Sequence, residues 1–344
     1  MTGHGSADSA ATDQAGLQRW LAALWDTPVE VSIVGESTAG ARRRNVVFDV
    51  TGGSRPGRFV ATILPTADIA IVSMADEAAV RTVARQSGVP VPEVIGVCSD
   101  ATVVGGEFFV SEFIAGETIP RRLLRLVHRT GIGDQVVAQL GVAFAALHSI
   151  EPTSAPAAIA APERPVEAAL DGVRLAIDGL LQPEPAFSYG LRWLRRHQPT
   201  EPLGQAIVHA DVRTGNIIVD ETGLRSILDW ETAKIGDPME DLAWVCTRMW
   251  RFGEDHLEVG GLGLTATLRE AYEYAGGRWD DDRFHWWRVL TTLRWGTGMA
   301  GQAAMHLDGR YSTVVMAASG RRITELAYDA LGMILDDSAA TGGR

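Results

Sequence analysis

The chain has 344 residues, of which 46% are hydrophobic, and a formal net charge of −12. Its length permits a sizeable core and suggests two lobes, whereas its negative charge argues against a general nucleic-acid-binding protein. The sequence has no uninterrupted apolar run of about 20 residues, so no membrane span is predicted. Its two cysteines, Cys98 and Cys246, do not make a disulfide framework, which favours a reducing cytoplasm.

The two ends of the chain are predicted to be disordered. Residues 1–16 lack the basic start and apolar centre of a secretory signal, so we expect a short disordered arm there. Residues 337–344 are expected to form a frayed tail.

A β-rich lobe is predicted for residues 17–115. Apolar residues recur at helical spacing in its first segment, and strand-like runs separated by turn residues follow. The expected helix, three strands, second helix and final pair of extended runs are, in chain order, 17–27, 29–36, 44–50, 57–64, 75–87 and 105–116.

A larger helical lobe is predicted for residues 116–336. One helix carries Val136, Leu140, Phe144 and Leu147 on a single face. After a Pro/Ala-rich loop at 155–165, further helices are expected at 166–181, 186–197, 239–251, 264–275, 281–305 and 320–335. The stretch 206–238 is the only β-type insertion in this lobe, and the whole order predicts an α+β fold.

Polar side chains stand at the ends of two apolar runs within this insertion. Residues 217–219 and 227–228 are expected to form a hairpin with its turn near residues 221–223, which would bring Asp211, Asn216 and Asp229 together. Carboxylate and carboxamide oxygens are hard ligands that suit Mg²⁺ together with substrate phosphates. In protein kinases an Asp receives the substrate hydroxyl proton, while an Asn and a later Asp hold the metal ions.

The motifs in this region carry a resemblance to a known family. "HADVRTGN" (209–216), "LDWE" (228–231) and "GDPMEDLAW" (236–244) resemble the aminoglycoside phosphotransferase and choline kinase-like family of small-molecule kinases. Ala210 replaces the glycine usual in that family. The resemblance covers roughly residues 30–310, and is strongest to a branch that includes kinase domains attached to acyl-CoA dehydrogenases. It implies a protein kinase-like, two-lobed fold.

The resemblance assigns roles to residues of the second lobe. Asp211 would be the catalytic base or would orient the substrate hydroxyl, and Asn216 and Asp229 would bind Mg²⁺. His209 is expected to support the loop by hydrogen bonding. The other supporting residues are Arg213, Glu231 and Asp237, and local rules predict that Asp237 caps the helix that Pro238 begins.

The resemblance also implies a nucleotide site in the first lobe, for ATP with GTP as a possibility. The residues assigned to it are Gly40, Arg42, Glu77 and Glu112. Arg42 stands where the family commonly has serine. For any single arginine of the 42–44 turn, the alternative interpretation is a basic turn exposed to solvent.

The third strand departs from the family pattern. Thr62 occupies the position of a Lys or Arg that pairs with phosphates and with a helix glutamate, here Glu77. Lys234 is the only lysine in the chain, and Arg58 lies about 13 Å along the strand. An arginine of the 42–44 turn folding inward is the remaining source of charge.

Two functions remain open from the sequence. The first is a phosphotransferase that acts on a hydroxyl of a small molecule, as a monomer or homodimer. The second is a catalytically weak, kinase-like protein that binds nucleotide or a small ligand in a regulatory role, which Thr62 favours.

The acceptor is equally open. Glu254, Asp255 and Glu258 could face an aminoglycoside or form an acidic surface loop. Trp286, Trp287 and Trp295 could line a pocket for an apolar acceptor or belong to the core. The branch resemblance points to a hydroxyacyl thioester or another metabolite.

Overall fold

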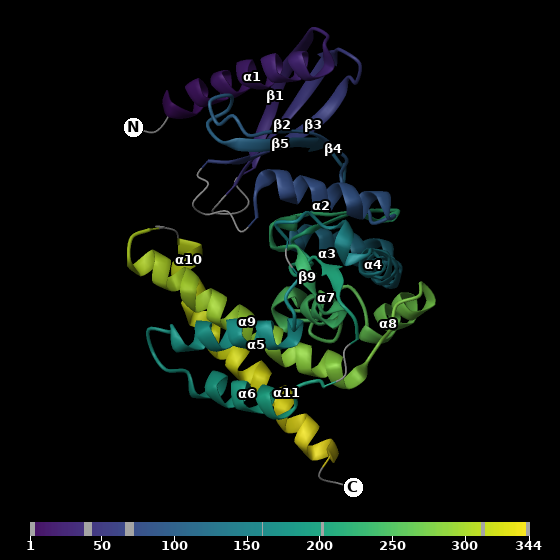
Figure 1. Cartoon of the computed structure of the whole chain (residues 1–344), viewed down its shortest axis with the longest axis vertical. Helices are drawn as coiled ribbons and strands as arrows, with labels where there is room; N and C mark the ends of the chain where they lie inside the picture. Colours follow the sequence, from purple (N-terminus) through teal and green to yellow (C-terminus); the bar gives the residue numbers. More distant parts are fainter. Residues whose placement is uncertain are drawn as a thin grey trace.

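The computed structural model describes residues 4–37, 43–65, 72–159, 161–200, 203–310 and 314–341, and the side chains among these from residue 13 to residue 336. The described residues form a β-rich lobe followed by a helical lobe (Figure 1). The α+β, two-lobed fold expected from the sequence is confirmed.

The first lobe is built on one antiparallel sheet of five strands in the order β1-β2-β3-β5-β4. Apolar residues alternate with polar or half-buried ones along β2 and β3, so each strand has one core face. The strands are β1 (Val29–Ser37), β2 (Arg44–Gly52), β3 (Gly57–Leu64), β4 (Val94–Cys98) and β5 (Glu107–Glu112).

Helix α1 (His4–Trp25) covers the core face of this sheet (Figure 1). Leu17 and Leu21 are fully buried against the sheet's apolar residues, among them Phe48. The prediction of a disordered arm over residues 1–16 is therefore wrong from residue 4 onward. Asp13 is also buried, and its carboxylate pairs with Arg44 of β2 at 2.5 Å. This contact with the sheet stabilises a segment whose composition alone predicts no helix.

Helix α2 (Met74–Gln86) lies between the sheet and the helical lobe (Figure 1). Ser73 caps its first turn by accepting a hydrogen bond from the nitrogen of Asp76. Met74 and Ala78 pack on Phe109 of β5. Phe109 pairs with Thr62 in the sheet, so α2 covers the face opposite α1.

The helical lobe has one continuous core that includes the fully buried Trp286 and Trp287. Its helices are α3 (Pro120–Thr130), α4 (Gly133–His148), α5 (Pro165–Asp178), α6 (Pro185–Arg196), α7 (Pro238–Val245), α8 (Thr265–Tyr274), α9 (Asp281–Leu307), α10 (Val314–Ser319) and α11 (Ile323–Thr341). Its short strands are β6 (Ala206–Val208), β7 (Ile217–Asp220), β8 (Gly223–Ile227) and β9 (Lys234–Gly236).

The predicted hairpin is confirmed. β7 pairs with β8 in antiparallel register, with Ile217 opposite Ile227, and β6 pairs with β9. Other expectations were wrong in part. Helix α3 was not expected, the helix expected at 239–251 ends at Val245, and the tail expected from residue 337 continues α11 to Thr341.

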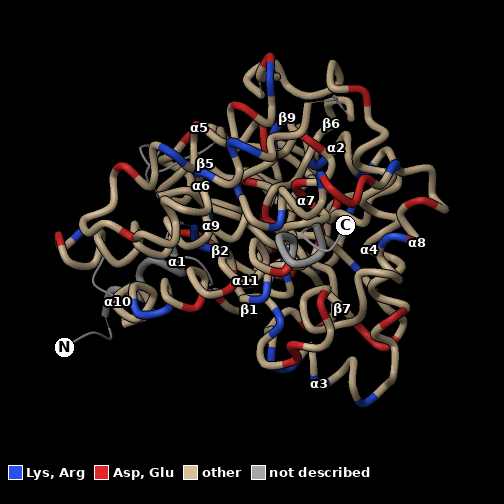
Figure 2. The backbone as a smooth tube through the Cα atoms, turned by 90° about the horizontal axis from the view of Figure 1, so that it is seen from below, with Lys and Arg blue, Asp and Glu red and all other residues tan. Residues whose placement is uncertain are grey.

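In the described part of the chain, no single helix is long and apolar enough to cross a membrane, although α3 and α4 pass that test together as a pair bent by 116°. Acidic and basic residues are interspersed along the described chain (Figure 2). Many of them form ion pairs with each other, such as Arg55 with Glu93 and Arg174 with Asp178.

Candidate active site

A loop between β6 and β7 carries the first candidate residues, and Asp241 of α7 holds its start. One carboxylate oxygen of Asp241 accepts a hydrogen bond from the backbone nitrogen of His209 at 2.8 Å, and the other accepts one from Ala210 at 2.6 Å. Ala210 has a φ of 63°, a left-handed conformation that glycine adopts more easily. This conformation explains why the resembling family has glycine here.

The pKa of Asp241 lies below its ordinary value. Burial alone would raise this pKa, but the hydrogen bonds from His148 and from the backbone N–H of His209 lower it. The Asp241 carboxylate is therefore ionised and fully hydrogen-bonded inside the helical lobe.

The His209 ring connects this loop to the segment that carries Asp229. Its Nδ1 accepts a hydrogen bond from the Asp211 nitrogen at 3.2 Å, so Nε2 is the protonated nitrogen that donates to the carbonyl of Leu228 at 3.0 Å. The ring is fully buried and lies against Trp230, with ring centroids 4.6 Å apart. With both nitrogens engaged, His209 positions Asp211 relative to Asp229.

The Asp211 carboxylate is oriented by donors on both oxygens. Asn216 Nδ2 donates to one oxygen at 2.7 Å, and Trp244 Nε1 donates to the other at 3.1 Å. Arg213 Nε also lies 3.4 Å from the second oxygen. Burial raises the pKa of Asp211, the charge of Arg213 opposes this, and the neighbouring negative charge of Asp229 adds to the increase.

Asn216 and Asp229 meet where the hairpin closes. The nitrogen of Leu228 donates to the carbonyl of Asn216 at 2.8 Å, which brings Asn216 beside the residue that precedes Asp229. Asn216 Nδ2 also donates to the Asp211 carbonyl at 2.9 Å. Since Nδ2 makes this bond and the bond to the Asp211 carboxylate, Asn216 Oδ1 is the side-chain atom that can ligate a metal ion.

These residues fit Mg²⁺ by their donor chemistry. Carboxylate and amide oxygens are its preferred protein ligands, and a divalent cation would offset the mutual repulsion of Asp211 and Asp229. Among the described residues, no group of three or more His, Cys, Asp or Glu side chains could hold a metal ion by itself. Mg²⁺ is usually bound by one or two carboxylates together with substrate phosphates and water.

Glu77 and Glu231 meet at one arginine. Arg43 NH1 lies 2.6 Å from a Glu77 carboxylate oxygen, and Arg43 Nε lies 3.2 Å from a Glu231 oxygen. Glu77 is on α2 and Glu231 is in the one-turn helix η3 (Trp230–Thr232), so Arg43 joins the two lobes. Sequence reasoning had left open which arginine of the 42–44 turn folds inward, and the structure identifies it.

The other candidate nucleotide-binding residues are placed differently. Gly40 and Arg42 lie outside the described residues, so their assignment stays a prediction. Glu112 accepts a hydrogen bond from the nitrogen of Glu93 at 2.9 Å and pairs with Arg85 at 3.0 Å. It braces the segment before β4, and its role in nucleotide binding also stays a prediction.

The remaining supporting residues have structural contacts. Arg213 lies over the ring of Trp250, with its guanidinium carbon 5.3 Å from the ring centroid. Asp237 caps α7 by accepting from Met239 N at 3.0 Å, and pairs with Arg283 at 2.5 Å. The predicted cap is confirmed, with Pro238 in the first turn.

Trp244 and Arg294 contact the loop that carries Asp211, and sequence reasoning missed both. Arg294 donates to the carbonyl of Ala210 at 3.2 Å and lies over the Trp244 ring, 4.4 Å from its centroid. Trp244 follows Asp241 by three residues, which places both on one face of α7. This spacing was a signal for Trp244, whereas Arg294 lies 84 residues from Ala210 and had no local signal.

The acidic loop of Glu254, Asp255 and Glu258 follows η4 (Arg248–Arg251). Two of its three carboxylates are engaged in contacts within the protein. Asp255 pairs with Arg248 at 2.8 Å, and Glu258 accepts a hydrogen bond from the nitrogen of Thr265 at 3.2 Å. These two carboxylates therefore belong to the structure of the loop.

The tryptophans divide into two groups. Trp286 and Trp287 are core residues. Trp295 packs with Trp250 at a centroid distance of 4.9 Å and with Trp244 at 5.9 Å. Because Trp244 bonds to Asp211, this second group is an aromatic cluster adjoining the candidate catalytic carboxylate.

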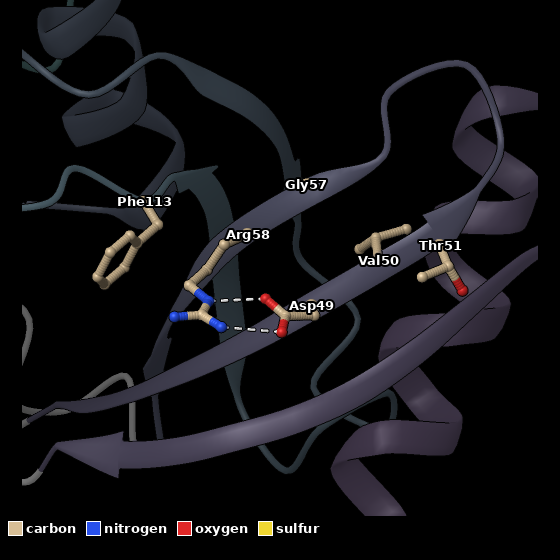
Figure 3. A pocket seen from close by; sticks show the side chains of 6 residues that line it. All are labelled: Asp49, Val50, Thr51, Gly57, Arg58 and Phe113. Carbon is tan, nitrogen blue, oxygen red and sulfur yellow. Dashed lines mark hydrogen bonds and ion pairs between the residues drawn. The ribbon is translucent and has the colours of Figure 1, made fainter.

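An open hollow of about 500 Å³ lies at the far end of the sheet face that carries Thr62. Arg58 and Asp49 form a two-bond ion pair there, at 2.7 and 2.9 Å, with Phe113 beside them (Figure 3). Side chains alternate along a strand, so Arg58 lies on the same sheet face as Thr62, and Asp49 lies on the same face as Asn45. Asn45 is the cross-strand partner of Thr62, so all four side chains share one face.

The model of a family described as "Phosphotransferase enzyme family" matches residues 37–287. Among curated proteins, acyl-CoA dehydrogenase family member 11 of Gallus gallus is 28% identical over 204 residues, which is 54% of this chain and 24% of that protein. The chain therefore matches only about a quarter of that relative's length.

Solved structures of phosphotransferases share the fold. A candidate aminoglycoside phosphotransferase of Ralstonia eutropha has a TM-score of 0.70 and 22% identity, with 92% of this chain and 96% of that chain covered. The aminoglycoside phosphotransferase APH(4)-Ia, in a ternary complex with AMP-PNP and hygromycin B, has a TM-score of 0.58 and 17% identity, with 91% and 98% covered.

Proposed function

Because this chain belongs to the phosphotransferase enzyme family, we propose that it is an Mg²⁺-dependent kinase that transfers the γ-phosphate of ATP to a hydroxyl of a small molecule. The observation that carries this proposal is the fixed position of the Asp211 carboxylate. Asn216 and Trp244 donate hydrogen bonds to its two oxygens, and the His209 ring accepts a hydrogen bond from the Asp211 backbone nitrogen. Such a carboxylate can only accept hydrogen bonds, which suits it to orient an acceptor hydroxyl.

A residue of this chain can take up the proton that the acceptor hydroxyl loses. The acceptor hydroxyl would donate to Asp211, whose raised pKa makes it a stronger base than an exposed aspartate. Asn216 and Trp244 keep the carboxylate in one orientation through the transfer, which lowers the cost of reaching the reactive geometry. Asn216 Oδ1 and Asp229 would hold Mg²⁺, which when bound supplies positive charge to the phosphate oxygens.

Helix α2 packs on Phe109 and Leu64 of the sheet face opposite α1, and the rest of that face offers a place for the nucleotide. Arg43 stands at one end of this face, near Asp229, and the hollow with Arg58 and Phe113 lies at the other. A nucleotide lying along the face would direct its phosphates toward Arg43 and its base toward Phe113. APH(4)-Ia, which has the same fold, binds AMP-PNP, and this supports ATP as the phosphate donor.

Within this function, we favour a hydroxyacyl thioester or a similar apolar metabolite as the acceptor. The aromatic cluster of Trp244, Trp250 and Trp295 adjoins Asp211. Asp255 and Glu258, which a cationic aminoglycoside would need, are engaged within their own loop. The similarity to an acyl-CoA dehydrogenase family member points the same way.

Thr62 supports a second candidate, a weak or inactive kinase-like protein that binds nucleotide to regulate another process. Thr62 replaces the strand cation and donates to Asn45 Oδ1 at 2.9 Å, so its hydroxyl proton is already engaged. The two functions differ in one measurable property, which is turnover that depends on an acceptor.

The test uses the purified chain with Mg·ATP and a panel of acceptors. The panel contains hydroxyacyl thioesters of increasing chain length, free hydroxy acids, and kanamycin and hygromycin B. ADP release and the mass gain of one phosphoryl group on the acceptor are measured. We expect turnover with a hydroxyacyl thioester, a loss of about 10²- to 10⁴-fold in Asp211→Asn, and no turnover with excess EDTA.

The matched control for Asp211→Asn is Asp220→Asn, which changes a half-buried aspartate at the far end of β7. This control should keep wild-type turnover. If Mg·ATP binds but no acceptor gives turnover above the Asp211→Asn level, the kinase proposal fails and the regulatory candidate stands.

A further inference from the structure

The strand position that carries the phosphate-binding cation in the resembling family is occupied here by a neutral side chain. Thr62 Oγ1 donates to Asn45 Oδ1 across the β2–β3 pair at 2.9 Å. Thr62 is therefore both uncharged and engaged. If a nucleotide binds this sheet face, its phosphates need positive charge from another residue.

The Arg43 side chain reaches the sheet face that carries Thr62. Asn45 is directly opposite Thr62 in the sheet, and directly opposite residues share a face. Arg43 lies directly before β2, and its guanidinium group pairs with Glu77 of α2, the helix that packs on this face. A long cationic side chain from the end of β2 therefore reaches the face on which Thr62 carries no charge.

Arg43 makes the ion pair that the strand cation would make. It is buried, with 9% of its surface exposed, and its NH1 pairs with Glu77 of α2 at 2.6 Å. Its Nε lies 3.2 Å from Glu231, two residues after Asp229. The Glu77 partnership is therefore present in this chain, with the donor moved from β3 to the start of β2.

Three buried donor nitrogens at this pair have no hydrogen-bond partner among the described residues: Nε and NH2 of Arg43, and Nε of Arg81. Nε of Arg43 still lies at ion-pair distance from Glu231. Arg81 lies over Phe109, its guanidinium carbon 4.5 Å from the ring centroid, and Phe109 is the β5 residue opposite Thr62. Phosphate oxygens are the acceptors that guanidinium groups match best, because they accept several N–H bonds and carry negative charge.

These donors also lie near the candidate metal site. The negative charge of Asp229 acts on both Arg43 and Arg81. Burial lowers the pKa of Arg81 to about 10, which leaves it protonated at neutral pH. Two cations with unpaired donors therefore lie close to a carboxylate that is suited to hold Mg²⁺ with phosphates.

We propose that Arg43 is the phosphate-binding cation of this chain, contacting the α- and β-phosphate oxygens of the nucleotide through NH2 while Glu77 and Glu231 hold its guanidinium group. Arg81 supplies a second donor from α2. This inference rests on the proposed nucleotide-dependent function.

The test compares the binding of Mg·ATP, Mg·ADP and adenosine to the wild type and to Arg43→Gln, by calorimetry for the nucleotides and by ligand-observed NMR for adenosine. Loss of a charge-assisted contact should weaken Mg·ATP and Mg·ADP binding by about 10- to 100-fold. Adenosine has no phosphate, so its affinity should change by less than about 3-fold. Arg44→Gln is the matched control, since Arg44 pairs with Asp13 and Glu36, and it should bind ATP as the wild type does.

A rescue variant gives a result that a purely structural role for Arg43 would not produce. Thr62→Lys in the Arg43→Gln background restores the family's arrangement and should recover most of the ATP affinity. If Arg43→Gln does not fold, Arg43→Lys replaces it, because Lys keeps the charge for Glu77 but lacks the NH2 donor. That variant should bind ATP about 3- to 10-fold more weakly than the wild type.

The failures of the two proposals are distinguishable. If the wild type binds ATP and the folded Arg43 variant binds it equally well, the inference about Arg43 is overturned and the proposed kinase function stands. If the wild type binds neither Mg·ATP nor Mg·GTP, the proposed function is overturned, and this inference with it.

Discussion

Asp241 accepts a hydrogen bond from the backbone nitrogen of Ala210 at 2.6 Å, and this contact holds a left-handed residue directly before the candidate catalytic aspartate. The helix that presents Asp241 begins with Asp237 as its N-cap and Pro238 in its first turn, so a local helix start sets the position of a distant loop. The same carboxylate also accepts from His209 and His148. Its loss should therefore affect stability and the geometry of Asp211 together.

Asp241→Asn should reduce the free energy of unfolding by about 1–3 kcal/mol at pH 7, because an amide supplies one acceptor oxygen where two are needed. The folded-state pKa of Asp241 is below its unfolded value of about 3.9. Its stabilisation is thus present above about pH 4 and is lost as the pH falls through the folded-state pKa. The Asn variant should lack this part of the acid-induced loss.

Urea unfolding of the wild type and of Asp241→Asn between pH 3 and pH 7 checks this prediction. Asp171→Asn, which alters an exposed aspartate of α5, is the control and should follow the wild-type pH dependence. Equal stability of the Asn variant and the wild type at pH 7 would contradict the anchoring role.

Substitutions at Ala210 should show the cost of its backbone conformation. A non-glycine residue in the left-handed region costs about 1–2 kcal/mol, while glycine increases the entropy of the unfolded chain by about 0.4–1 kcal/mol. Ala210→Gly should therefore be neutral or stabilising by up to about 1 kcal/mol. Ala210→Val should be destabilising, because a β-branched side chain is strained further at a φ of 63°. Thermal unfolding of both variants measures the order, and a valine variant as stable as the glycine variant would exclude this strain.

The docking of α1 on the sheet can be measured with two leucines of one helix. Leu17 is fully buried, whereas Leu24 is 45% exposed. Leu17→Ala should reduce the free energy of unfolding by about 2–5 kcal/mol, and Leu24→Ala by less than about 1 kcal/mol. Chemical denaturation of both variants gives the comparison. Equal small losses would mean that α1 contributes little to the lobe.

Cys246 should be unreactive in the folded protein. Burial raises its pKa to about 11, and only a thiolate reacts with an alkylating reagent. At pH 8.5 roughly 0.3% of this thiol would be ionised, and access is blocked as well. Iodoacetamide labelling followed by peptide mass mapping should modify Cys246 only after denaturation. Rapid labelling of the native protein at this residue would contradict its placement.

Short-range features of the candidate site could be predicted from the sequence. The β7–β8 hairpin follows from two apolar runs around a glycine-bearing turn, and the α7 cap follows from Asp237 and Pro238. Each depends on residues within a few positions of one another. The meeting of Asp211, Asn216 and the segment before Asp229 was predictable for the same reason.

The tertiary structure decided what depends on partners that are far apart in the chain. Helix α1 packs on the sheet through Leu17 and Leu21, and Asp13 pairs with Arg44, contacts that the composition of the helix does not indicate. The contact of Arg294 with the catalytic loop depends on how α9 packs against α7, which the order of residues in either helix does not reveal. Long-range packing therefore determines both the docking of α1 on the sheet and the contact of Arg294 with Ala210.

The sequence by itself determined the two lobes, the hairpin and the identity of the polar residues around Asp211, because helical and strand periodicity and turn chemistry are local properties. It also showed that Thr62 carries no charge. Only the tertiary structure decided that Arg43 takes the ion pair with Glu77. Arg43 lies directly before β2, far in sequence from both Glu77 and Glu231. The packing of α2 on the sheet and the docking of the two lobes bring these three residues together.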